Sequence, residues 1–178
     1  MKRFVLALVV GALAVGTASL PAAAANRPPT IVGIASSNPA FSTLTAAVVC
    51  TGLAPTLNGR ARYTVFAPTD GAFASLGLNA SNVCSALPTS TLKNILLYHV
   101  TPGTRYARSV LPRHSNQWRT IATLLDDQAF QVNSQGAIRT SSGGTSQIIQ
   151  SNIAASNGVI HVINAVLIPG TAHSEEDD

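Results

Sequence analysis

The chain has 178 residues, of which 46% are hydrophobic and 10% are charged, and its formal net charge is +4. This length suits one domain with a sizeable core, and the composition excludes a wholly disordered chain. Four of the seven acidic residues follow one another at the end of the chain, from Glu175 to Asp178, so the preceding body is basic. We expect residues 170–178 to form a solvated, disordered acidic tail.

Residues 1–25 have the pattern of a secretory signal peptide. Two basic residues precede an almost unbroken apolar stretch from residue 4 to residue 15, and Ala23–Ala25 supplies a small-residue cleavage site. The stretch is shorter than the roughly 20 residues that a membrane-spanning helix needs. We predict cleavage before Asn26, an extended segment at 26–29, and secretion into the periplasm or the extracellular medium.

The sequence contains two cysteines, Cys50 and Cys84. An exported chain meets an oxidising compartment, where an even pair of cysteines normally forms a disulfide. A bridge that closes a loop of about 35 residues stabilises a fold by about 3–4 kcal/mol in the chain-entropy model. Two thiols without the CxxC spacing do not indicate a zinc or redox site. We therefore predict a structural disulfide.

The first predicted helix covers residues 39–53. Phe41, Leu44 and Val48 recur at helical spacing and share one face. Cys50 lies on the opposite face, which is also apolar. We expect the segment around Cys84 to cover that face.

A strand rich in Tyr, Thr, Val and Phe is predicted at residues 62–67, and Pro68 ends it. Thr69 is a suitable N-cap for a short helix. Asp70 then lies in the first turn of that helix, where a negative charge is favoured. A contact with a binding partner is the alternative role for Asp70, and we favour the capping role.

A second clear helix is predicted from residue 88 into Tyr98-His99-Val100, because Leu92, Ile95 and Leu96 share a face. From residue 105 onward the pattern changes to short β-rich runs. The candidate strands are 105–110, 118–124, 129–133, 137–140, 147–153 and 159–167. Asn157-Gly158 is a tight-turn signal before the last run. Helices early and strands late predict an α+β fold, with the strands in one or two small antiparallel sheets.

Three segments, in this order, resemble motifs of the fasciclin-type domain family. They are Thr64–Asp70 with Ala72 and Phe73 following, the pair Tyr98-His99, and Gly158–Asn164. The resemblance covers residues 30–169. It implies a compact fasciclin-like β-sandwich or wedge with packed helices. It also implies an extracellular role in adhesion, without catalysis and without a cofactor.

The resemblance implies a recognition role for Tyr98 and His99, because that region is linked to integrin recognition in animal members of the family. The alternative, which we favour, is that both are packed and that His99 is hydrogen-bonded internally. Gly71 and Asn164 stand where family members often carry an acidic residue, so we carry over no acidic contact. We expect Gly158 and Asn164 to be structural.

His161 lies in an alternating strand and shares a face with Val159 and Ile163. We expect a satisfied core histidine there, in preference to a ligand.

An acid-free stretch carries four arginines with interleaved aromatic residues. Its members are Arg105, Tyr106, Arg108, Arg113, His114, Trp118 and Arg119. Such a pattern suits an anionic polymer. For an exported chain the candidate ligands are an anionic polysaccharide or membrane headgroups, and we expect no nucleic acid. The alternative, which we favour, is an ordinary solvated loop and hairpin.

The sequence contains no pattern of an enzyme or of a metal site. It has no G-x-S-x-G or H-E-x-x-H motif, and Asp70, Asp126 and Asp127 are the only acids of the body. We therefore predict no catalytic residues, no metal and no cofactor. The predicted function is adhesion by a monomeric secreted domain to a cell surface or an extracellular matrix, with a cell-surface protein or an anionic polysaccharide as the partner. The alternative is an extracytoplasmic carrier or binder of a small apolar ligand, held in an apolar pocket, or of an anionic polysaccharide.

Overall fold

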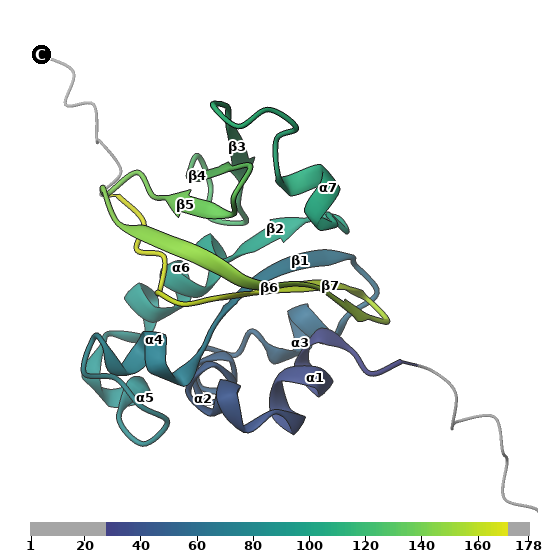
Figure 1. Cartoon of the computed structure of the whole chain (residues 1–178). Helices are drawn as coiled ribbons and strands as arrows, with labels where there is room; N and C mark the ends of the chain where they lie inside the picture. The colour runs from purple at the N-terminus through teal and green to yellow at the C-terminus, as the bar shows by residue number, and fades with distance from the viewer. Residues whose placement is uncertain (1–27, 171–178) are drawn as a thin grey trace, which may run out of the picture.

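The computed structural model describes residues 28–170 (Figure 1). The predicted signal peptide and residues 171–178 of the predicted tail lie outside the described residues. Within residues 28–170, no single helix is long and apolar enough to cross a membrane. Ile31–Ser37 and Pro39–Cys50 meet the length and composition only as a pair, and they are bent by 107°.

The first half of the chain forms a layer of short helices. They are α1 (Ile31–Ser37), η2 (Pro39–Phe41), α2 (Ser42–Cys50), α3 (Ala54–Asn58), α4 (Asp70–Ala74), α5 (Val83–Ala86) and α6 (Thr89–Tyr98). The helix predicted at 39–53 is present as η2 and α2, and the chain then turns at Gly52, whose φ is 70°. The sequence did not predict α1, which begins where Thr30 Oγ1 accepts a hydrogen bond from the Gly33 N–H.

The strands form one seven-stranded sheet in the order β2-β1-β7-β6-β5-β4-β3. They are β1 (Tyr63–Pro68), β2 (Val100–Pro102), β3 (Trp118–Ala122), β4 (Ala129–Asn133), β5 (Ala137–Arg139), β6 (Thr145–Ala155) and β7 (Gly158–Ile163). The α+β class is confirmed. The prediction of purely antiparallel sheets is wrong, because β1 and β7, the first and last strands, pair in parallel.

The strand predicted at residues 105–110 is also wrong. Those residues contain a short helix, α7 (Ala107–Val110). Asn152 Oδ1 accepts a hydrogen bond from the Ala107 N–H, and the Arg119 guanidinium donates to the Ser109 carbonyl. Both contacts satisfy backbone groups at the ends of the helical turn, which a β-propensity pattern does not register.

Strand β6 joins the two halves of the sheet. Its first residues pair with β5, and its later residues pair with β7. Register shifts interrupt the β6–β7 pairing on both sides of Gln150, and Asn152 has a positive φ of 63°. Such irregularities bend a strand. The bend lets one long strand serve both halves (Figure 1).

Strands β1 and β7 are buried on both faces. Val65 of β1 packs with the helices, whereas Phe66 packs with β3, β4 and β5. The same alternation separates Ile160 from Ile163 in β7. In Figure 1 the helices α1 to α5 lie below this pair of strands and β3 to β5 lie above it. The wedge therefore has two cores, one on each face of β1 and β7.

Candidate functional site

Thr69 and Asp70 hold two helices in place. Thr69 Oγ1 accepts a hydrogen bond from the Ala72 N–H and caps α4. The Asp70 carboxylate, however, reaches the start of α2, where it accepts bonds from the Thr43 N–H at 2.8 Å and the Ser42 hydroxyl at 2.5 Å. Burial raises the pKa of Asp70, but the bonds from Ser42 and Thr43 outweigh it and leave the pKa below its ordinary value. Asp70 is thus engaged in a helix–helix contact that sequence reasoning did not foresee.

Tyr98 is fully buried. Its hydroxyl donates to the Ala129 carbonyl at 2.8 Å, and its ring packs edge-on against Phe130. The Ser141 N–H donates to the same hydroxyl at 3.3 Å. Tyr98 therefore fastens α6 to β4 and to the segment after β5, and it is not available at the surface to contact a partner.

His99 is also buried, with 2% of its surface exposed. Its Nδ1 lies 2.7 Å from the Ile95 carbonyl, and the Leu167 N–H donates to its Nε2 at 2.9 Å. These partners select the neutral tautomer with the proton on Nδ1. Burial lowers the pKa of His99 to about 4, although the bond to the Ile95 carbonyl opposes the shift. The position of His99 supports the core interpretation over direct recognition.

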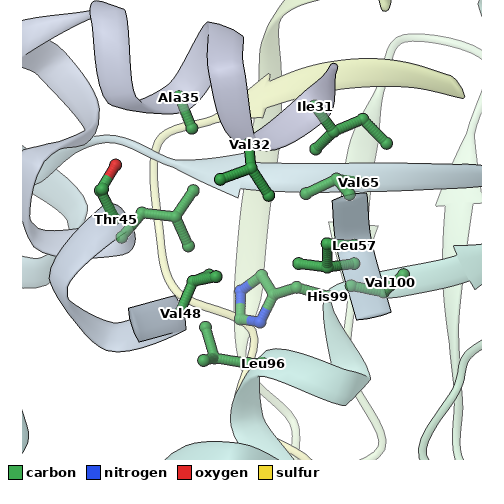
Figure 2. Close-up of a pocket in the computed structure, with 11 residues that line it drawn as sticks. Ile31, Val32, Ala35, Thr45, Val48, Leu57, Val65, Leu96, His99 and Val100 are labelled. Atoms are coloured by element: carbon green, nitrogen blue, oxygen red, sulfur yellow. The ribbon is translucent and has the colours of Figure 1, made fainter. Parts of the chain in front are cut away.

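An apolar cavity of about 30 Å³ lies beside His99, among α1, α2, α6 and β1 (Figure 2). Figure 2 shows the imidazole between Val48, Leu96 and Val100. The hydroxyl of Thr45 at its edge has no hydrogen-bond partner among the described residues. Pockets for drug-sized ligands are commonly about 300–1,000 Å³. This cavity is too small for such a molecule in the described conformation.

His161 is fully buried in β7. Its Nε2 lies 2.9 Å from the Arg105 carbonyl, and the Asn152 N–H donates to its Nδ1 at 3.4 Å. Burial lowers the pKa of His161, and the bond to the Arg105 carbonyl opposes this shift. Both ring nitrogens thus have backbone partners, which is the arrangement of a structural histidine.

Asparagine side chains at both ends of β7, Asn157 and Asn164, bind neighbouring backbone groups. Asn164 Oδ1 accepts from the Gln147 N–H at 2.9 Å, which extends the pairing of β7 with β6. Asn157 Oδ1 accepts from the Ile31 N–H, and its Nδ2 donates to the Leu57 carbonyl. Sequence reasoning treated Asn157 only as a turn signal, and it missed these bonds to α1 and α3.

Gly158 is required by a close backbone approach. A Cβ atom at this position would lie 1.9 Å from the Tyr63 carbonyl oxygen of the paired strand β1. The parallel pairing of β1 with β7 therefore needs glycine at residue 158.

The disulfide between Cys50 and Cys84 is present, with a Cα–Cα distance of 6.1 Å. It joins the end of α2 to α5 at the surface. The helix layer is thereby linked across 34 residues of sequence.

The four arginines of the stretch 105–119 differ in their exposure and in their contacts. Arg108 and Arg113 are exposed, whereas Arg105 is half-buried and its backbone carbonyl faces His161. Arg119 lies on the same side of β3 as the buried Ile121, and its guanidinium donates to the Ser109 carbonyl at the end of α7. The Arg119 guanidinium therefore makes an internal hydrogen bond to the backbone.

Trp118 lies on the opposite, outer side of β3 and is 39% exposed. The guanidinium carbon of Arg139, on β5, stands 4.2 Å from the centre of its indole ring. Arg139 Nε donates to Gln131 Oε1 at 2.6 Å. Sequence reasoning missed Arg139 because only the register of β3, β4 and β5 places it beside Trp118.

Within residues 28–170, no group of three or more His, Cys, Asp or Glu side chains is arranged to hold a metal ion. Asp126 and Asp127 lie in the turn between β3 and β4, and Asp127 has a positive φ of 56°.

Comparison with known proteins gives a specific match. The family model described as "Fasciclin domain" matches residues 39–169. The Synechocystis protein sll1483 is 37% identical over 150 residues, which are 83% of this chain and 77% of that protein. Transforming growth factor-beta-induced protein ig-h3 of Sus scrofa is 32% identical over 147 residues, covering 83% of this chain but only 20% of its own length.

A solved structure shares the fold. It is a FAS1 domain pair from the insect cell adhesion molecule fasciclin I, with a TM-score of 0.67 and 19% identity. The match covers 80% of this chain and 51% of that one, so this chain spans about half of the pair.

Proposed function

This chain belongs to the fasciclin domain family, and we propose that it is a secreted domain that attaches to a cell surface or an extracellular matrix without catalysis. The observation that carries the proposal is the family match over residues 39–169. The fold shared with a domain pair of an insect cell adhesion molecule supports it. The signal pattern of residues 1–25 supports secretion.

The charge of the body supports attachment to an anionic surface. Residues 28–170 contain eight arginine and lysine residues against three aspartates. One of the three, Asp70, is engaged at the start of α2. A protein with such an excess of positive charge attracts polyanions over several ångströms at low salt.

The carrier alternative receives less support. The apolar cavity of about 30 Å³ beside His99 is far smaller than the pockets of small-molecule binders. Tyr98 and His99 satisfy their polar atoms inside the protein. A binding surface on the outside of the domain therefore fits the structure better than an internal pocket.

The test is the attachment of whole cells to the immobilised, purified protein at low and high salt. Attachment that weakens as salt rises supports binding through the basic surface. Attachment that resists salt supports adhesion through an apolar contact. Absence of attachment to folded protein would reject the adhesion proposal.

A further inference from the structure

We infer that the outer face of β3, β4 and β5 is a binding site for an acidic polysaccharide bearing uronic-acid carboxylates, with Arg139 and Trp118 at its centre. This inference rests on the proposed function, since it names the surface and the ligand class through which attachment would occur. It assigns binding to Arg139, which lies outside the arginine-rich stretch, and it removes Arg119 from the site.

The first observation is the fixed position of the Arg139 side chain. Its guanidinium carbon lies over the Trp118 ring, 4.2 Å from the ring centre, and its Nε donates a hydrogen bond to Gln131 Oε1. Gln131 in turn donates to the Thr120 hydroxyl at 3.4 Å. An arginine that is already ordered loses less conformational entropy on binding than a free one.

The second observation is the absence of an internal counter-charge. Of the five N–H groups of a guanidinium, only Nε–H of Arg139 has a partner, and its Nη atoms have no acceptor within residues 28–170. The acids of the same part of the chain are Asp70, at the start of α2, and the pair Asp126–Asp127, in the β3–β4 turn. The two Nη groups thus present an unused fork, which matches the two oxygens of a carboxylate.

The third observation is the chemistry around the fork. The side chains on this outer face are one guanidinium, one indole, one hydroxyl, two amides and three alanine methyl groups. They belong to Arg139, Trp118, Thr120, Gln131, Asn133, Ala122, Ala129 and Ala137. Apart from the indole, the apolar side chains of this face are alanines, which are too small to form the large packed apolar centre of a typical protein–protein interface. Hydroxyl and amide groups suit the hydroxyls of a sugar, while the guanidinium, supported by the indole ring, suits its carboxylate.

The position of the face in the molecule is compatible with a long polymer. Strands β3 to β5 lie at the end of the wedge away from helices α1 to α5 (Figure 1). On their other side, Ile121, Phe130 and Ile138 are buried in the second core. The binding face is therefore carried by a rigid sheet, and a chain of sugars has access to it from the outside.

The test is binding of purified polygalacturonate to the purified protein and to four variants. We expect Arg139→Gln to weaken binding by about tenfold or more, as the loss of a charged, two-point hydrogen bond predicts. Arg139→Lys, which keeps the charge but not the fork, should recover only part of that loss. Trp118→Ala should also weaken binding, because it removes the stacking surface and frees Arg139.

Arg60→Gln is the matched control, since Arg60 is exposed in the turn between α3 and β1 and the change removes the same charge. It should alter binding by less than about twofold. Equal losses in Arg60→Gln and Arg139→Gln would overturn the inference in favour of net charge alone. Unchanged binding in folded Arg139→Gln, checked by circular dichroism and thermal unfolding, would also overturn it.

Two further ligands test which chemical class of molecule binds this face. Methyl-esterified polygalacturonate should not bind, because it lacks the carboxylates. If poly-glutamate binds as tightly and with the same dependence on Arg139, the ligand of this face would be an acidic peptide. That outcome would overturn the inference. Cells that still attach to an Arg139→Gln surface would reject this site and leave the adhesion proposal standing.

Discussion

The Asp70 carboxylate accepts a hydrogen bond from the Thr43 backbone N–H at 2.8 Å, across 27 residues of sequence. Asp70 begins α4, whereas Thr43 lies in the first turn of α2. Phe41, the residue before α2, has no side-chain oxygen that could cap this helix. The Asp70 side chain, which belongs to α4, therefore caps α2. One side chain thereby couples the start of two helices.

Replacement of Asp70 should therefore act on stability. We expect Asp70→Ala to lower the free energy of unfolding by about 1–2 kcal/mol, as the loss of a helix cap does. Asp70→Asn keeps an acceptor oxygen and should lower it less. Urea unfolding at pH 7 measures both. A result in which the two variants are equally destabilised would show that the charge, and not the acceptor, matters.

The lowered pKa of His99 predicts that the folded protein loses stability in mild acid. Its pKa is lowered to about 4 in the folded protein and is near 6.5 in the unfolded chain. Between these values the unfolded chain binds a proton that the folded protein does not, so stability falls as pH falls from about 6.5 to 4. From pH 7 to pH 5 the loss from His99 is about 2 kcal/mol. The lowered pKa of His161 adds to it in the same direction.

Urea unfolding at pH 7 and pH 5 measures this loss, and His99→Gln is the matched variant. Glutamine carries a donor and an acceptor but does not titrate, so the difference between the two pH values should shrink by about 2 kcal/mol. The wild-type imidazole can also be followed by NMR in the folded protein. A His99 signal that titrates near pH 6.5 would contradict the prediction.

Gly158→Ala should disrupt the centre of the sheet. The added Cβ would meet the Tyr63 carbonyl oxygen at 1.9 Å, and this atom belongs to a backbone that cannot rotate away. We expect a loss of about 3 kcal/mol or more in the free energy of unfolding. Gly143→Ala is a useful contrast, since a Cβ there meets nothing within 4 Å although φ is 86°. Thermal unfolding of both variants separates the close approach from the cost of a positive φ.

The sequence was sufficient where a signal is local. Thr69 was predicted as a helix cap from its position after Pro68, and alternation in β7 placed His161 in the core. It was insufficient where a partner lies far along the chain. The target of Asp70, the pairing of β1 with β7, and the stacking of Arg139 on Trp118 depend on tertiary contacts. No periodicity within a single segment encodes such partners.

Removal of the disulfide should weaken the helix layer. The bond joins Cys50 to Cys84 across 34 residues, and its loss through a double change to serine should cost about 3–4 kcal/mol in the chain-entropy model. Urea unfolding of the oxidised protein and of the double variant gives the difference. The binding face on β3 to β5 lies away from α2 and α5 (Figure 1). Binding of polygalacturonate by the folded double variant should therefore be unchanged.

The acidic end of the sequence should compete for the Arg139 face. The described chain ends at Gly170, whose N–H donates to Ser141 Oγ at 3.0 Å, and Ser141 follows Arg139 closely in sequence. Glu175 to Asp178 follow Gly170 by five to eight residues, a reach of up to about 30 Å for an extended chain. Because four negative charges follow Gly170 within this maximum reach, we expect them to raise the local concentration of a competing carboxylate.

Neutralisation of Glu175, Glu176, Asp177 and Asp178 to the corresponding amides should therefore tighten binding of polygalacturonate, by about threefold to tenfold at low salt, and by less at high salt. The control combines the same four changes with Arg139→Gln. If the tethered charges act on the Arg139 fork, the gain should shrink in that combined variant. A gain of the same size with and without Arg139 would mean that the acidic residues act only through the net charge of the protein.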